Sequence, residues 1–86
     1  MIFKLTINGE ASVDARKLTK LIHKASGFNS LIYIEKDERK ANVKSLMGVL
    51  SLAIKGGDNI SLIAQGDDER EAIDSLSSFI NNGFSE

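Results

Sequence analysis

Ser45 is the side chain of this 86-residue sequence that is best placed for chemistry. It precedes a short apolar run, so its hydroxyl can cap a helix that begins there. A phosphate on a serine in that position meets backbone N–H groups and the positive end of the helix dipole, and it adds roughly −1.5 to −2 charges beside Lys44. From its position alone, Ser45 is either an unmodified helix cap or a serine that can carry a regulatory phosphate.

A second group of polar side chains lies at Asp14, Arg16 and Lys17. The Asp14 carboxylate can cap a helix, a contribution of about 1 kcal/mol, or it can present a fixed negative charge to a partner. The Arg16 guanidinium can bind carboxylates or phosphates through two parallel hydrogen bonds, or it is an ordinary exposed arginine. Phosphorylation of Asp14 would need an acidic cluster that holds Mg²⁺ and a nearby lysine, and only Lys17 is close in sequence. We therefore expect Asp14 to carry no phosphate.

Other catalytic chemistry finds little support in the sequence. The single histidine, His23, falls on the side of a predicted helix opposite its apolar residues and lacks the cluster of ligands that a metal site requires. Cysteine, a P-loop, a dinucleotide-binding fingerprint and a nucleophile elbow are all absent from the sequence. We expect a protein that is not an enzyme and that uses no metal and no cofactor.

The spacing of apolar residues predicts the elements that must position these side chains. Period-two alternation and β-branched or aromatic residues indicate strands at 3–7, 31–35, 41–43 and 60–65, and helical spacing runs over 18–25, 46–53 and 72–80. The order strand, helix, strand, strand, helix, strand, helix predicts an α+β fold with a mostly antiparallel sheet and helices on one face. Because the sequence contains no linker or repeat, we expect one domain over 1–86.

Turn and cap residues predict where several of these elements begin and end. Gly27 is placed for a left-handed conformation after the first helix, and Asn82-Gly83 can close the last one. Asp68 and Glu71 have the spacing of a capping box. The charged stretch at 36–40 is expected to form an extended hairpin between the second and third strands.

The short second helix is too apolar to bury every side. We expect Val49 and Ala53 to lie in the core. At least one of Leu46, Met47 and Leu50 should be exposed and available to a partner, a role that suits the adaptable methionine side chain.

The overall composition excludes several classes of partner. Eleven Lys and Arg residues against twelve Asp and Glu residues give a formal charge of −1, which argues against direct binding to nucleic acid. The sequence has neither a secretory leader nor an apolar run of about 18 residues, so we expect a cytoplasmic protein that does not enter a membrane.

Two segments resemble a known family. Residues 44–52, KSLMGVLSL, strongly resemble the regulatory serine motif of HPr proteins. Residues 13–16, VDAR, resemble that family's active-centre segment, in which a histidine normally precedes Ala-Arg and a proline follows; here these positions hold Asp14 and Lys17. HPr proteins are phosphocarriers of the bacterial sugar phosphotransferase system. The resemblance implies their open-faced sandwich, a four-stranded antiparallel sheet covered on one face by three helices.

The missing histidine implies a member of the catabolite repression HPr branch, which cannot transfer phosphate through histidine. In that branch Ser45 would be phosphorylated by an ATP-dependent HPr kinase/phosphorylase. The phosphorylated protein would then act as corepressor of a LacI-type transcription factor. The residues implied to bind these partners are Asp14, Arg16, Lys17, Lys44, Leu46, Met47 and Leu50.

Two other functions stay open at this point. Asp14 could act as a phosphocarrier in place of the histidine, or the chain could be an HPr-derived binding module that regulates a metabolic enzyme. Lys17 and the charged stretch at 36–40 are departures from the family that could alter recognition. The sequence leaves the oligomeric state, the partner and the regulated genes undetermined.

Overall fold

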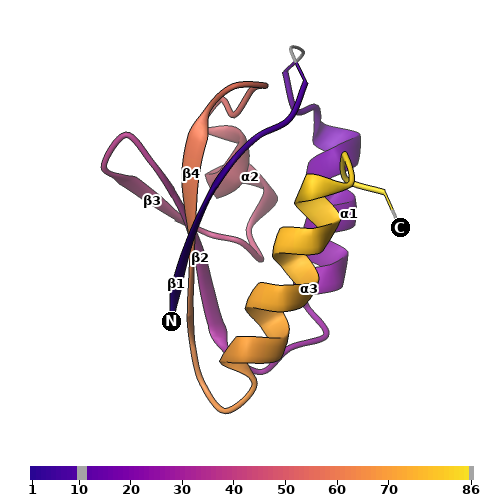
Figure 1. The fold of residues 1–86 in the computed structure, drawn as a ribbon. Coiled ribbons are helices and arrows are strands. Elements are labelled where there is room, and N and C mark those ends of the chain that lie inside the picture. The colour runs from indigo at the N-terminus through magenta and orange to yellow at the C-terminus, as the bar shows by residue number, and fades with distance from the viewer. Residues whose placement is uncertain (10–11, 86) are drawn as a thin grey trace.

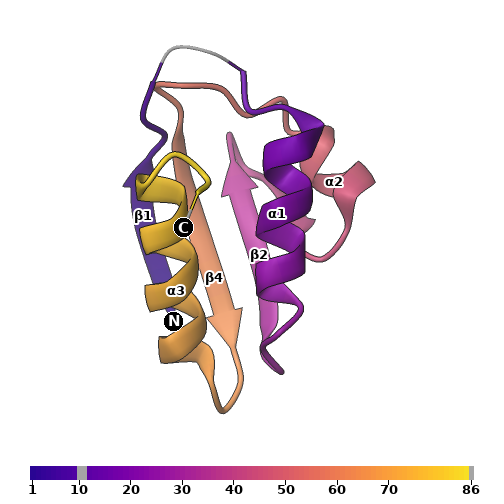
Figure 2. The same cartoon turned by 90° about the vertical axis from the view of Figure 1, so that its right-hand side faces the viewer.

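The computed structural model describes residues 1–9 and 12–85, and its elements follow the predicted order. They are β1 (Ile2–Thr6), α1 (Ala15–Ala25), β2 (Leu31–Lys36), β3 (Arg39–Asn42), α2 (Leu46–Leu50), β4 (Asn59–Gln65) and α3 (Glu69–Asn81). Within the described residues, four strands form one antiparallel sheet in the order β1-β4-β2-β3, and the helices lie on one side of it (Figure 1). Figure 2 shows α3 over β1 and β4, and α1 over β2. The predicted open-faced α+β sandwich is confirmed.

Alternation along the central strand β4 builds the core. Ile60, Leu62 and Ala64 are buried on the side that the helices cover. Leu62 lies opposite Phe3 in β1 and Ile34 in β2, and residues directly opposite each other share one face of a sheet. The helices add the fully buried side chains Leu18, Leu21, Leu76 and Ile80. Burying each of these side chains stabilises the fold by about 1.5–3 kcal/mol.

No helix of the described residues lies over the opposite face of the sheet. Ile2, Tyr33 and Ile63 occupy one row across its strands, because Ile63 of β4 is paired with both Ile2 and Tyr33. Leu31, at the start of β2, is 56% exposed. This face therefore offers exposed apolar residues that lie away from the helices.

Two of the predicted turns differ from the structure. Gly83 has a φ of +74° and closes α3 as expected, but the left-handed conformation predicted at Gly27 is wrong. Its N–H donates to the carbonyl of Lys24 at 3.2 Å, so the chain continues in a tight right-handed turn. The charged stretch is also more compact than expected, because Asp37 (φ 52°) and Glu38 (φ 66°) alone form the turn between β2 and β3.

The capping box predicted at Asp68 and Glu71 is wrong as well. Asp68 precedes α3 but makes no side-chain cap. Its carboxylate instead accepts hydrogen bonds from the N–H of Asn29 at 2.8 Å and from the N–H and hydroxyl of Ser30. These bonds hold the start of β2 against the start of α3, and the bond from the Ser30 hydroxyl is the main cause that lowers the pKa of Asp68.

Stability is expected to fall as the pH drops through the carboxyl range. The pKa values of Asp58 and Asp68 are lowered in the folded protein, chiefly by hydrogen bonds from Lys36 and Ser30. Such a carboxylate stabilises the fold above its unfolded pKa of about 3.9, and this contribution is lost as the pH falls through the lowered folded value. We expect the midpoint of urea unfolding to decrease between about pH 5 and about pH 2. Asp68→Asn should weaken the pH dependence of the midpoint more than Asp74→Asn, which changes an exposed residue of α3. A midpoint independent of pH would contradict a stabilising role for the Asp58 and Asp68 carboxylates.

Candidate functional site

Ser45 occupies the position predicted for it at the start of α2. Its backbone is extended, and its hydroxyl oxygen accepts a hydrogen bond from the N–H of Gly48 at 3.3 Å. Its carbonyl accepts the N–H of Val49 at 3.0 Å, which begins the helix. The side chain is exposed. The predicted cap is thus confirmed, and the hydroxyl is accessible from solvent.

The apolar residues of α2 divide between the core and solvent. Val49 is fully buried and Leu46 packs partly against the core. Met47 is 79% exposed and Leu50 is 38% exposed, so the expectation of an exposed apolar side chain on this helix is confirmed. An exposed methionine beside an exposed leucine is a suitable contact for a protein partner.

Asp14 caps α1 in the manner predicted. Its Oδ1 accepts the N–H of Lys17 at 2.9 Å, and its carbonyl accepts the N–H of Leu18. Arg16 is exposed in the first turn, and Lys17 is half-buried. The sequence of α1, ARKLTKLIHKA, contains basic residues and no acidic one, so its exposed side is positively charged.

A pair of backbone contacts joins the segment before α1 to the turn that follows α2. The N–H of Val13 donates to the carbonyl of Ile54 at 3.0 Å, and Ser12 pairs with Lys55 in an isolated β-bridge. The segment before Asp14 is therefore fixed to the chain that follows α2, and Figure 2 shows α2 beside the N-terminal half of α1. The five residues of α2 span only about 7.5 Å at 1.5 Å per residue. We call the set Asp14, Arg16, Ser45, Met47 and Leu50 the α1–α2 surface.

Lys44 is exposed, and its ammonium is bonded to the loop after α1. Its ammonium donates to the carbonyl of Phe28 at 2.8 Å and lies 3.4 Å from that of Ser30. Its own N–H donates to the side chain of Asn42. The lysine expected to lie beside an added phosphate is therefore already bonded to the loop, and it anchors the turn that leads to Ser45.

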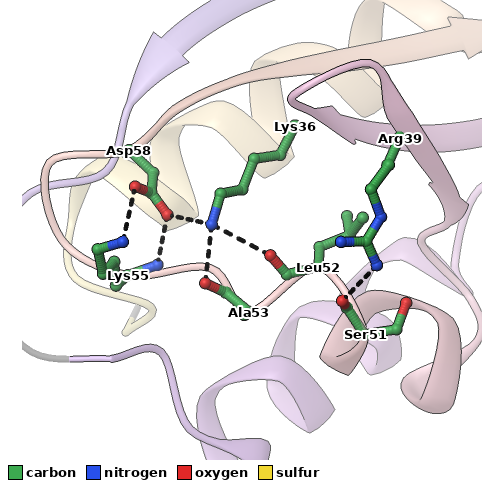
Figure 3. Close-up of polar contacts among 7 residues, drawn as sticks. All are labelled: Lys36, Arg39, Ser51, Leu52, Ala53, Lys55 and Asp58. Atoms are coloured by element: carbon green, nitrogen blue, oxygen red, sulfur yellow. Dashed lines mark hydrogen bonds and ion pairs between the residues drawn. The ribbon is translucent and has the colours of Figure 1, made fainter.

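The end of α2 differs from the sequence-based expectation. The prediction that Ala53 lies in the core is wrong: the helix ends at Leu50, and Ala53 is exposed with a φ of +50°. Lys36 and Arg39, from the β2–β3 hairpin, donate to the carbonyls that follow the helix (Figure 3). Sequence reasoning missed both residues as parts of the site, because they lie 12 to 17 residues from the carbonyls that they bind and no local pattern links them.

His23 is exposed on α1, as expected. It borders an open hollow of about 520 Å³ between α1 and α3, which is also lined by Thr19, Lys20, Phe79 and Ser85. The described residues contain no group of three or more His, Cys, Asp or Glu side chains that could hold a metal ion. In the same part of the chain, no helix has the length and hydropathy needed to cross a membrane.

The fold and the α1–α2 surface define a class of small protein: an open-faced sandwich in which two neighbouring helices begin at exposed residues, one of them a serine. The family model described as "PTS HPr component phosphorylation site" matches residues 2–82, and the chain belongs to the HPr family.

Individual relatives point to one branch of that family. HPr-like protein Crh from Halalkalibacterium halodurans is 45% identical over 71 residues, which cover 83% of this chain and 84% of the relative. The crystal structure of HPr-C-His from Thermoanaerobacter tengcongensis superposes with a TM-score of 0.92 at 38% identity and covers 100% of this chain and 97% of that chain. The crystal structure of Crh from Bacillus subtilis, a catabolite repression protein seen as a domain-swapped dimer, has a TM-score of 0.78 at 36% identity and covers 91% of this chain and 90% of that chain.

Proposed function

We propose that this protein is a non-catalytic cytoplasmic regulator of carbon catabolite repression that is switched by phosphorylation of Ser45. HPr kinase/phosphorylase would transfer the γ-phosphoryl group of ATP to the Ser45 Oγ and release ADP. The phosphorylated protein would then bind a LacI-type transcription factor as its corepressor. The names of the Crh relatives support this branch of the family.

The observation that carries the proposal is the exposed Ser45 hydroxyl beside the exposed Met47. A kinase can reach this hydroxyl without unfolding α2, because among the described residues only the Gly48 N–H bonds it. A phosphate there would change the charge of a surface whose apolar residues already face solvent. The switch thus needs no change of fold, only a change in what the α1–α2 surface presents to a partner.

Asp14 supports the same conclusion from the opposite direction. A carboxylate cannot form the labile phosphoramidate through which a histidine passes phosphate on. In this chain the Asp14 side chain is used to cap α1 through the Lys17 N–H. Arg16, exposed two residues later, is free of a phosphohistidine partner and can bind acidic groups of the repressor through its guanidinium fork.

Intact mass after incubation with HPr kinase/phosphorylase and ATP tests the proposal. We expect one phosphate on the wild-type protein and none on Ser45→Ala. Ser51→Ala is the matched control, because Ser51 is an exposed serine at the other end of α2 whose hydroxyl bonds the Gly48 carbonyl at 2.6 Å. This variant should still gain the phosphate. An unmodified wild-type protein, or a phosphate that survives Ser45→Ala, would contradict the proposal.

A further inference from the structure

Lys36 and Asp58 form a shielded ion pair at the end of α2. The Lys36 ammonium lies 2.7 Å from the Asp58 Oδ2, and it donates to the carbonyls of Ala53 at 2.9 Å and Leu52 at 3.1 Å (Figure 3). Only 12% of the Lys36 side chain and 15% of the Asp58 side chain are exposed. An ammonium has three N–H donors, so these three acceptors satisfy it completely.

The pair joins three parts of the chain that are distant in sequence. Lys36 is the last residue of β2, its carbonyl acceptors lie in the turn after α2, and Asp58 directly precedes β4. The Asp58 carboxylate also accepts the N–H of Lys55 at 2.9 Å, and its other oxygen lies 3.8 Å from the Lys55 ammonium. The turn is therefore held from both of its ends.

Cations are needed here because of the turn that follows α2. The last carbonyls of the helix itself already accept N–H groups from residues 51–53. The left-handed conformation of Ala53 then turns the chain away, so the carbonyls of residues 51–53 receive no N–H from a continued helix. Arg39 binds the carbonyl of Ser51 at 2.7 Å, and Lys36 binds the next two carbonyls.

The same turn also holds the segment before Asp14. Ile54 supplies the carbonyl that accepts the Val13 N–H, and Lys55 makes the bridge to Ser12. A continuous set of contacts thus runs from Lys36 and Asp58, through 52–55, to the start of α1. Displacing the turn would move Asp14 and Arg16 relative to Ser45 and Met47.

We propose that Lys36 and Asp58 are positioning residues that fix the start of α1 against α2, so that a partner meets the α1–α2 surface as one rigid unit. Neither side chain touches the partner in this proposal. The recognition role rests on the proposed function, whereas the structural coupling between Lys36 and the Ser12–Val13 segment stands independently of it.

Lys36→Met tests both parts, because methionine keeps most of the apolar stem and removes the ammonium. Amide hydrogen exchange should show the Val13 N–H exchanging about tenfold faster, with little change at Leu62 in the centre of the sheet. With HPr kinase/phosphorylase, KM for the protein should rise about tenfold, and kcat should change much less. A role in overall stability alone would speed exchange at Val13 and Leu62 together and leave KM unchanged in the folded protein.

Lys40→Met is the matched control, since it removes a positive charge from the same hairpin. The Lys40 ammonium lies over the ring of Tyr33, 5.5 Å from its centroid, and within the described residues it does not hydrogen-bond the turn after α2. Lys40→Met should leave both the exchange rate at Val13 and the KM for the kinase near their wild-type values. Asp58→Asn provides a second variant of nearly the same shape, with effects in the same direction as those of Lys36→Met.

The two readouts separate the possible failures. If Val13 exchange is unchanged in both Lys36→Met and Asp58→Asn, the positioning proposal is wrong, whatever the kinase does. If exchange rises at Val13 in the variants, but the kinase phosphorylates the variants and the wild type with the same KM, the recognition part is overturned. If the kinase leaves even the wild type unmodified, the proposed function fails, and hydrogen exchange alone decides the coupling.

Discussion

Gly66→Ala is expected to destabilise the protein by about 3 kcal/mol, through backbone strain and overpacking together. Gly66 has a φ of +154°, a conformation that side chains disfavour. A Cβ at this position would lie 2.6 Å from the Ser30 Oγ and 2.8 Å from the Ser30 Cα. Ser30 cannot easily withdraw, because its N–H and its hydroxyl are both bonded to Asp68.

Gly83→Ala separates the two causes of this loss. Gly83 also has a positive φ, +74°, but a Cβ added there would meet no atom within 4 Å. It should therefore cost only the conformational penalty of about 1–2 kcal/mol. Urea unfolding of the two variants at neutral pH measures the difference in unfolding free energy. Equal losses would show that the close approach of Ser30 to Gly66 adds nothing to the destabilisation.

Met47→Asp is expected to weaken partner binding about 30-fold, the equivalent of about 2 kcal/mol, while leaving the stability of the protein nearly unchanged. Because Met47 is 79% exposed, few of its contacts within the fold are lost on substitution. A partner that buries this side chain would instead have to bury a carboxylate. Titration of the Ser45-phosphorylated protein against the LacI-type repressor measures the affinity.

Two matched variants control for the change in chemistry. Leu31→Asp introduces the same carboxylate at an exposed apolar residue on the uncovered face of the sheet, and it should not affect binding. Met47→Leu keeps an apolar side chain and should retain most of the affinity. Equal weakening by Met47→Asp and Leu31→Asp would indicate a general charge effect and would exclude α2 as the specific contact.

The strands and the two helix starts could be predicted because they depend on neighbours along the chain. Ile60, Leu62 and Ala64 alternate with less buried residues, and this pattern is sufficient to define β4 and its covered face. Asp14 and Ser45 cap their helices by accepting an N–H three residues later, so the signal for each is local. The candidate site was therefore visible in the sequence at its two most exposed positions.

Two of the errors arose where partners are distant in the sequence. Asp68 has an acidic residue three positions later, as in a capping box, but its donors lie 38 and 39 residues away. Ala53 follows Val49 by one helical turn, yet the chain leaves the helix earlier and Lys36 binds the exposed carbonyls from another strand. Such contacts depend on the packing of the sheet, which local spacing does not encode.

Because β1 lies at the edge of the sheet, it is paired late in synthesis. Among the described strands its only partner is β4, so Leu5 can be paired only after Ile60 has been synthesised. The β2–β3 hairpin needs only its two-residue turn and can form while synthesis continues. The sheet, by contrast, is completed only after β4 has left the ribosome, and until then the apolar side chains of β1 are available to chaperones. Of the four described strands, β1 is synthesised before the others yet is paired only when β4 becomes available.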